Sequence, residues 1–187
     1  MKQIGNRSFS KTEIESITIP KHLTKIGEDT FFYCEKLHTF EIPIDSELRT
    51  IESDAFNCTQ IEKFTIPKTL VDLKRGCFNG MNNLNQIVVD AENPLYSMYD
   101  DKLLLCKTSE TSIEKDCIVT CVRNVESITI PSFIKSIGPN AFYDFQNLKK
   151  VEIPDDSQLL IIGENSFSRS TIEKFTFPHH LTKISKY

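Results

Sequence analysis

Short stretches in which apolar and polar residues alternate recur along this chain, and a proline follows almost every one. The apolar pairs are Ile17/Ile19, Phe40/Ile42, Phe64/Ile66, Ile87/Val89, Ile128/Ile130, Val151/Ile153 and Phe175/Phe177. β-Branched and aromatic residues that alternate with polar ones are typical of a strand with one buried face. Because proline has no N–H to donate to a ladder, each strand is expected to end after three or four residues.

These stretches follow one another at a nearly constant spacing. The residues that follow the pairs are Pro20, Pro43, Pro67, Asp90, Pro131, Pro154 and Pro178. Successive positions are 23 or 24 residues apart, except for one step of 41. Self-similarity at a period of about 20 to 50 residues predicts a solenoid, which offers an extended recognition surface in place of a catalytic pocket.

The rest of each unit repeats as well. A second apolar pair follows the proline at Leu23/Ile26, Leu48/Ile51, Leu70/Leu73, Ile134/Ile137, Leu159/Ile162 and Leu181/Ile184. A small residue and a phenylalanine come next, at Ser8-Phe9, Thr30-Phe31, Ala55-Phe56, Cys77-Phe78, Ala141-Phe142 and Ser166-Phe167. We expect the small residue to fit a tight turn and the ring to fill the interior, where its burial contributes about 1.5–3 kcal/mol. Phe31, Phe56 and Phe142 should therefore be buried.

Residues 91–125 interrupt the rhythm. Asn93-Pro94 and Tyr99-Asp-Asp101 indicate turns, and residues 103–105 and 118–120 indicate short strands. Val119, Val122 and Val125 precede Pro131 by the same intervals as the apolar residues of a regular unit. We interpret the segment as about 16 inserted residues and one degenerate repeat in which Cys106 takes the place of the proline. Insertions in solenoids often lie on the binding face, and a hairpin without a role is the alternative.

Composition and charge narrow the function classes. The chain has 187 residues and a net charge of −4, which argues against binding to nucleic acid or an anionic membrane. No apolar run reaches the roughly 20 residues of a membrane-spanning helix, and the N-terminus has no signal-peptide pattern. Membrane insertion is therefore not expected. A single domain is expected over residues 1–187, with seven regular units and one degenerate unit.

Few residues suggest chemistry. Cys34 and Cys58 fall in one column of the repeat and Cys77 in the small-residue column, where cysteine is expected to act as a small buried side chain. The remaining cysteines cluster at Cys106, Cys117 and Cys121, where a disulfide is an option in an oxidising compartment. We find no nucleophile with its base, no zinc spacing and no phosphate-binding loop. No catalytic, metal or cofactor site is predicted, and the chain is not expected to be an enzyme.

The unit reads apolar-x-apolar-Pro-x-x-Leu-x-x-Ile-Gly-x-x-Ala-Phe-x-x-Cys-x-x-Leu, most clearly at residues 17–37, 128–148 and 151–172. This pattern resembles the BspA-like leucine-rich repeats, and the segment that begins at Asn93 resembles an insert common in that family. The resemblance implies a right-handed curved coil with short parallel strands on its concave face and turns or 3-10 segments elsewhere. It also implies a surface or secreted protein that binds host proteins, matrix or other cells.

Two columns of strand residues are expected to point outward into the concave face. The candidate binding residues are Thr18, Glu41, Lys63, Thr65, Gln86, Thr129, Lys150, Glu152, Lys174 and Thr176. A small, polar lining of mixed charge suits a protein or glycan partner better than a hydrophobic ligand. We therefore expect an adhesion or recognition module. The alternative, suggested by ends that lack a polar cap, is a cytosolic scaffold or a truncated repeat-gene fragment without a ligand.

Overall fold

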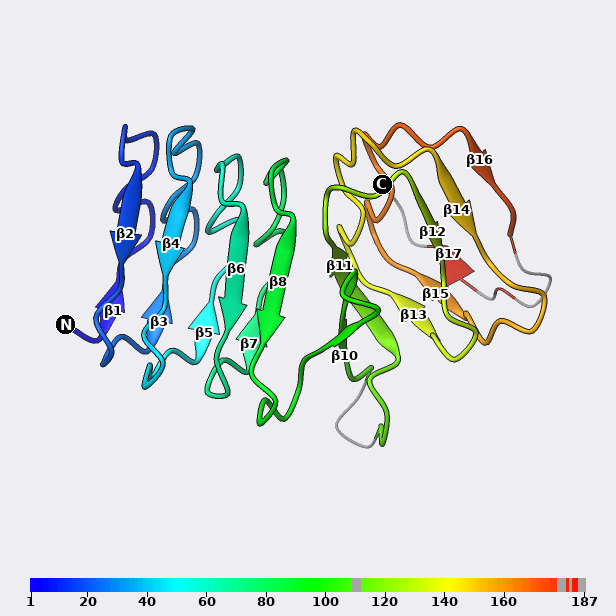
Figure 1. Cartoon of the computed structure of the whole chain (residues 1–187), viewed down its shortest axis with the longest axis horizontal. Helices are drawn as coiled ribbons and strands as arrows, with labels where there is room; N and C mark the ends of the chain where they lie inside the picture. Colours follow the sequence, from blue (N-terminus) through cyan, green and yellow to red (C-terminus); the bar gives the residue numbers. More distant parts are fainter. Residues whose placement is uncertain (109–111, 178–180, 182, 185–187) are drawn as a thin grey trace.

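The chain folds into a solenoid of about eight turns. The computed structural model describes residues 1–108, 112–177, 181 and 183–184, and this part of the chain contains strands and turns but no helix. Pro178, His179 and His180, which belong to the last repeat, lie outside the described residues. The predicted fold class is confirmed, with the coils stacked side by side along the longest axis of the molecule (Figure 1).

Each regular coil contributes one strand to each of two rows. The first row, called here the long-strand row, contains the strands of the apolar-x-apolar stretches: β2 (Ser16–Thr18), β4 (Thr39–Glu41), β6 (Lys63–Ile66), β8 (Gln86–Val89), β12 (Ser127–Thr129), β14 (Lys150–Glu152) and β16 (Lys174–Phe175). The second, the short-strand row, contains β1 (Gln3–Ile4), β3 (Lys25–Ile26), β5 (Thr50–Ile51), β7 (Asp72–Leu73), β13 (Ser136–Ile137), β15 (Ile161–Ile162) and β17 (Lys183–Ile184). Both rows follow from the two apolar pairs of the repeat.

Neighbouring strands of a row run parallel and align equivalent repeat positions. Ile17 is the register partner of Phe40, and Ile128 is the partner of Val151. The turns that carry the phenylalanines are joined in the same way. The main-chain N–H of Phe31 donates to the carbonyl of Ala55 at 2.8 Å, and that of Phe142 donates to Ser166 at 2.7 Å. Each coil therefore satisfies part of the next coil's backbone, as a solenoid with nearest-neighbour interfaces requires.

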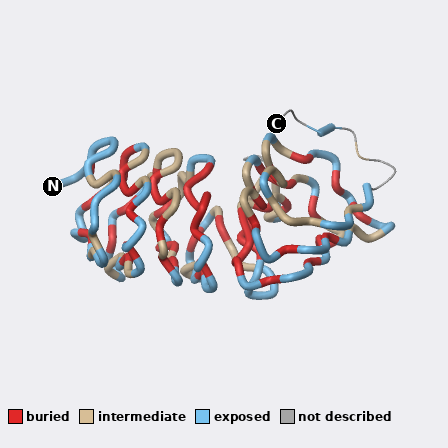
Figure 2. Tube along the Cα trace, turned by 90° about the horizontal axis from the view of Figure 1, so that it is seen from above, coloured by how far each residue is buried: buried red, intermediate tan, exposed pale blue. Residues whose placement is uncertain are grey.

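The phenylalanine column forms the centre of the interior. Phe31, Phe56 and Phe142 are fully buried, as predicted, and buried positions recur from coil to coil (Figure 2). The ring of Phe31 stacks on that of Phe56 with centroids 5.3 Å apart, and Phe142 stacks on Phe167 at 5.1 Å. Stacked aromatic pairs add about 0.5–1.5 kcal/mol to the burial term.

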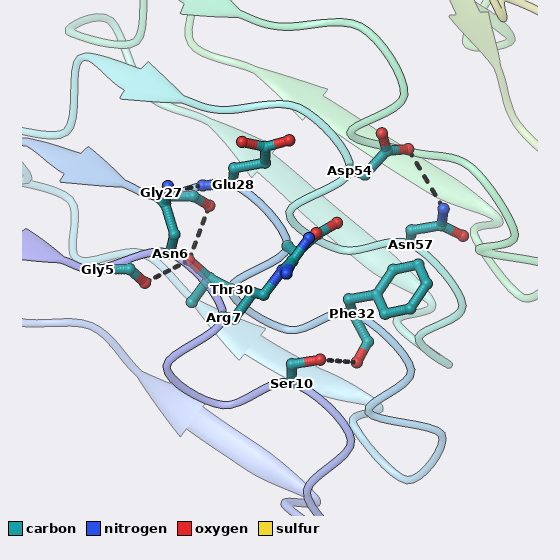
Figure 3. A network of polar contacts seen from close by, with 11 residues as sticks. Gly5, Asn6, Arg7, Ser10, Gly27, Glu28, Thr30, Phe32, Asp54 and Asn57 are labelled. Carbon is teal, nitrogen blue, oxygen red and sulfur yellow. Dashed lines mark hydrogen bonds and ion pairs between the residues drawn. The ribbon is translucent and has the colours of Figure 1, made fainter.

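Where the small residue before a phenylalanine is Ser, Thr or Cys, its side chain caps its own turn. The hydroxyl of Thr30 donates to the carbonyls of Gly27 at 2.7 Å and Gly5 at 3.2 Å, so one side chain ties two coils together (Figure 3). The thiol of Cys77 donates to the carbonyl of Lys74 at 2.7 Å in the equivalent position. The predicted buried role of Cys77 is thereby confirmed.

Every regular phenylalanine turn contains two residues with positive φ, four positions apart. They are Arg7/Lys11, Asp29/Tyr33, Asp54/Cys58, Gly76/Gly80, Asn140/Asp144 and Asn165/Arg169. Only one of these six turns uses glycine, although a positive φ costs an ordinary residue about 1–2 kcal/mol. The pattern corrects one prediction. Cys34 is buried, but Cys58 occupies the second positive-φ position and is half-buried, because Thr59 takes the column of Cys34.

The interruption is a hairpin added to the short-strand row. β9 (Ser97–Tyr99) and β10 (Leu103–Cys106) pair antiparallel, and β10 also pairs antiparallel with β11 (Cys117–Cys121), which runs parallel to β13. Strands were predicted at residues 103–105 and 118–120 and are found there. The position of Cys106 was predicted wrongly. It does not take the place of a proline at the end of a long strand, because β10 lies in the other row.

Candidate interaction surface

The candidate residues of the first four long strands lie on one side of the solenoid, and all of them except Thr65 are exposed. Thr18 lies opposite Glu41 in the register, and its hydroxyl donates to the Glu41 carboxylate at 2.8 Å. Lys63 pairs with Gln86, and the half-buried Thr65 pairs with the partly exposed Val88. These residues form the N-terminal half of the surface, and a depression of about 370 Å³ lies at its centre around Phe40 and Glu62.

The remaining candidates lie on the last three long strands. Thr129 is opposite Glu152, and its hydroxyl donates to that carboxylate at 3.2 Å. Lys150 forms an ion pair with Glu152 and is opposite Lys174 in the register. The hydrogen bonds from Lys150 and Thr129 lower the pKa of Glu152, so this carboxylate is charged at neutral pH. Thr176 is exposed next to the end of β16.

The structure does not unite these two halves in one sheet. The long strands are bonded in three groups, β2–β4, β6–β8 and β12–β14–β16. β4 and β6 still lie next to each other, whereas the hairpin is inserted between β8 and β12. Figure 1 shows β10 and β11 between β8 and β12. The sequence predicts two columns of side chains that continue along the whole solenoid, whereas the surface has an N-terminal half on β2–β8 and a C-terminal half on β12–β16.

Buried polar side chains that the sequence analysis did not single out stabilise the junction, by which we mean the region between β8 and β12. Arg123 is buried, and its guanidinium donates to the carbonyls of Phe78 at 2.7 Å and Tyr143 at 3.0 Å. It also lies 3.9 Å from the centroid of the Phe145 ring. Burial lowers the pKa of Arg123 to about 10, so the side chain still carries its charge at neutral pH. One side chain thus joins a turn on each side of the insertion.

Asn93 fastens the start of the insertion to the preceding coil. Its side-chain nitrogen donates to the carbonyls of Pro67 at 2.8 Å and Leu70 at 2.9 Å. Its side-chain oxygen accepts from the N–H groups of Leu95 at 2.9 Å and Tyr96 at 2.8 Å. A buried amide that is satisfied on both sides fixes the backbone geometry of the turn that was predicted at Asn93-Pro94.

Two of the three clustered cysteines face each other across the hairpin. Cys106 and Cys117 are register partners, whereas Cys121 lies opposite Leu103. A hydrogen bond between the two thiols raises the pKa of Cys106 and lowers that of Cys117. All six cysteines are free thiols in the structure. The sequence did not indicate which two of Cys106, Cys117 and Cys121 could pair, and the fold places Cys106 next to Cys117.

The described part of the chain shows no grouping of three His, Cys, Asp or Glu side chains that could hold a metal ion. Nor does it contain a helix long and apolar enough to cross a membrane. The functional features of the described residues are therefore the two halves of the long-strand surface and the hairpin between them.

The repeat and its coil geometry can now be compared with known proteins. A family model described as the BspA type leucine rich repeat region, with six copies, matches residues 2–107 and 111–187. The chain belongs to this family. Proteins with these repeats generally act as protein-interaction modules, and the family and its structural neighbours are generally non-enzymatic.

Solved structures of similar proteins support the fold. The pneumococcal vaccine antigen PcpA is 26% identical, with a TM-score of 0.83 over 97% of this chain and 44% of the PcpA chain. A leucine rich cell surface protein from Faecalibacterium prausnitzii A2-165 is 21% identical, with a TM-score of 0.75 over 98% of this chain and 59% of the other. The present chain thus spans about half the length of each. A search of curated proteins gave no match.

Proposed function

We propose that this BspA-type repeat protein is a non-catalytic recognition module that acts at the cell surface or after secretion and binds a protein or glycan. It binds through the exposed residues of the long-strand row, on the concave face of the coil. The observation that carries the proposal is the alignment of polar side chains of mixed charge on that row, at positions where the repeat needs no particular residue for its core. The similarity to a vaccine antigen and to a cell surface protein supports the location.

The chemistry of the surface supports a macromolecular partner. Glu41, Lys63, Lys150 and Glu152 are exposed charges that the two halves present in parallel strands. Exposed charges arranged in this way steer encounters and select partners more than they add affinity. The shallow depression around Phe40 is open and partly polar, which suits contact with an extended surface.

Charge reversal at the four residues tests the role of the surface. The variant carries Glu41→Lys, Lys63→Glu, Lys150→Glu and Glu152→Lys, so the net charge is unchanged. The wild-type chain is immobilised, the host-cell surface proteins and glycans that it retains are identified, and their affinity for each variant is measured. We expect the variant to lose at least tenfold in affinity while its unfolding midpoint stays close to that of the wild type.

A matched control places the same number of reversals on the other row. Lys25 and Glu52 form one ion pair on the short-strand side, and Asp72 and Lys74 form another. Reversal of these four residues also preserves the net charge and should leave the affinity unchanged. Equal losses in both variants would show that the long-strand row is not the recognition surface. Protease treatment of intact cells tests the location, because a surface protein is cleaved under these conditions and an internal one is not.

A further inference from the structure

The insertion leaves an unpaired strand edge in the middle of the chain. In the ladder between β12 and β14, the N–H of Ile130 donates to Glu152 at 2.8 Å and the N–H of Lys150 donates to Glu126 at 3.2 Å. Because alternate residues of a parallel strand bond to opposite neighbours, Ile128 and Ile130 direct their main-chain groups to β14. Ser127 and Thr129 therefore direct theirs away from it.

No strand of the described residues occupies that other side. β12 is bonded to β14 alone, and the main-chain N–H and C=O groups of Ser127 and Thr129 have no hydrogen-bond partner in the described protein. The corresponding edge of β8 differs, because β9 packs beside it. An unpaired edge presents a row of donors and acceptors that another extended chain can satisfy.

A groove follows this edge. It has a volume of about 820 Å³ and is lined by every residue from 127 to 132, together with Pro154 and Asp156. Side chains of a strand alternate between its two faces, so a groove lined by consecutive residues runs along the backbone. The opposite wall is the β9–β10 hairpin, through Tyr99, Asp100, Lys102 and Leu103. The hairpin thus interrupts the long-strand row and also forms one wall of the groove.

The lining of the groove carries one carboxylate that no lysine or arginine of the lining neutralises, that of Asp156. Asp100 is neutralised by Lys102, whose amino group lies 2.7 Å from the carboxylate. Asp156, which lines the groove, is exposed and forms no ion pair in the described part of the chain. Asp101 and Asp155, next in sequence to lining residues, are likewise exposed and form no ion pair there. Unpaired carboxylates around a strand edge favour a partner with basic side chains.

We propose that the groove along β12 binds an extended, basic peptide segment, which adds to the sheet as a strand. The proposal rests on the proposed function as a recognition module, and it names one class of partner and a site separate from the exposed charges of the long-strand row. The main-chain groups of Ser127 and Thr129 bond to the peptide backbone, while Asp156 binds a lysine or arginine of the peptide. At about 3.3 Å per residue, the groove accepts a segment of about six residues.

The test uses a positional library of blocked hexapeptides, with each position randomised in turn and binding measured by fluorescence anisotropy. We expect lysine or arginine to be selected and glutamate to be rejected. Methylation of alternate backbone nitrogens in the tightest hexapeptide should weaken binding at least tenfold, because it removes the donors that a strand needs. If no library member binds, or if acidic peptides bind as well as basic ones, the proposal is wrong.

An identical pentapeptide elsewhere in the chain provides a matched pair of variants. Ser16-Ile-Thr-Ile-Pro20 repeats Ser127-Ile-Thr-Ile-Pro131, and Ser16 likewise faces away from the neighbouring strand. Proline is tolerated at the first residue of a strand and on a strand edge. Ser127→Pro removes a donor in the groove and should weaken the selected hexapeptide at least fivefold, whereas Ser16→Pro should leave its affinity unchanged. Equal effects of the two variants would overturn the assignment.

Two further measurements test which molecule occupies the edge and how Asp156 contributes. Concentration-dependent dimerisation of the wild type that Ser127→Pro abolishes would assign the edge to a second copy of the chain and overturn the peptide proposal. Asp156→Asn should weaken binding of the basic hexapeptide severalfold and reduce the salt dependence of that binding, and an unchanged affinity would remove Asp156 from the site.

The four charge reversals that test the proposed function leave Ser127 and Asp156 intact. If that variant loses the macromolecular partner but still binds the hexapeptide, the two ligands use separate sites. If it keeps the macromolecular partner, the proposed function of the long-strand row fails while the groove remains supported by its own hexapeptide measurements.

Discussion

The regular coils and the inserted coil are held together by different interactions. In the regular coils, equivalent residues stack on one another, as the rings of Phe31 and Phe56 do at 5.3 Å. Between Phe78 and Phe142 the column has no further phenylalanine, and Val119, which the repeat spacing assigns to it, lies instead on β11 in the short-strand row and is only partly buried. The junction depends instead on buried polar side chains, Arg123 and Asn93 above all.

The difference shows how a repeat protein accommodates an insertion. A regular coil supplies backbone donors and acceptors to both neighbours, and an irregular coil leaves some of these groups without a partner. Arg123 satisfies two such carbonyls, one on each side of the junction. The hydrophobic repeat therefore sets the stability of the coils, and a few polar residues set the geometry of the break between them.

The largest expected effect concerns the stacked column. Phe56→Ala removes a fully buried ring that contacts Phe31, Phe40 and Phe64. We expect a loss of about 3–5 kcal/mol in the free energy of unfolding, measured by urea denaturation. Val119→Ala, at a partly buried position on β11 of the inserted coil, should cost less than half as much. Similar costs at both positions would show that the inserted coil packs like the regular ones.

Arg123→Ala is expected to have the next largest effect. It leaves the carbonyls of Phe78 and Tyr143 without their donor and removes the contact with Phe145, so we expect a loss of about 2–4 kcal/mol. Arg123→Met keeps most of the volume but not the donors, and should recover only a small part of the loss. Arg169→Ala, in which an exposed arginine is removed, should cost less than about 1 kcal/mol. If Arg123→Met unfolds with the same free energy as the wild type, the side chain of Arg123 acts by filling space and not by donating hydrogen bonds.

The hydrophobic pattern predicts the fold because the same constraint is repeated in every coil. The apolar pairs of both rows and the phenylalanine column each recur often enough to fix the register. The inserted strands have no such repetition. The run Leu103-Leu-Leu105 is apolar on both faces, so its residues do not indicate which row or direction β10 takes.

Two features of the candidate surface also escape prediction from the sequence. The division of the long-strand row follows from the antiparallel pairing of β10 with β11, a long-range contact without a local signal. The burial of Arg123 depends on carbonyls contributed by Phe78 and Tyr143, which lie 45 and 20 residues away. The outward direction of Glu41 and Lys150 could be predicted, because strand side chains alternate and their neighbours are apolar.

Asp116 makes the stability of the inserted coil depend on pH. Burial alone would raise its pKa, but the hydrogen bonds from Lys135 and Thr108 outweigh burial and lower it. A lowered pKa in the folded state stabilises the protein above the unfolded pKa of about 3.9, and this contribution is lost as the pH falls through the folded value. Asp116→Asn should therefore cost about 1–2 kcal/mol at pH 7 and progressively less below about pH 4, in urea denaturation at each pH. A cost that is independent of pH would contradict the role of the charge.

The smallest effect concerns the turns of the regular coils, and it has the opposite sign. Lys11 is exposed and has a φ of 59°, a conformation that costs an ordinary residue about 1–2 kcal/mol and glycine almost nothing. Since glycine also has more freedom to lose on folding, we expect Lys11→Gly to stabilise the protein by about 0.5 kcal/mol. Lys107→Gly, in the inserted coil where φ is negative, should destabilise it slightly by the same entropic term. Unfolding midpoints that move in opposite directions would show that the backbone is strained at Lys11 and not at Lys107.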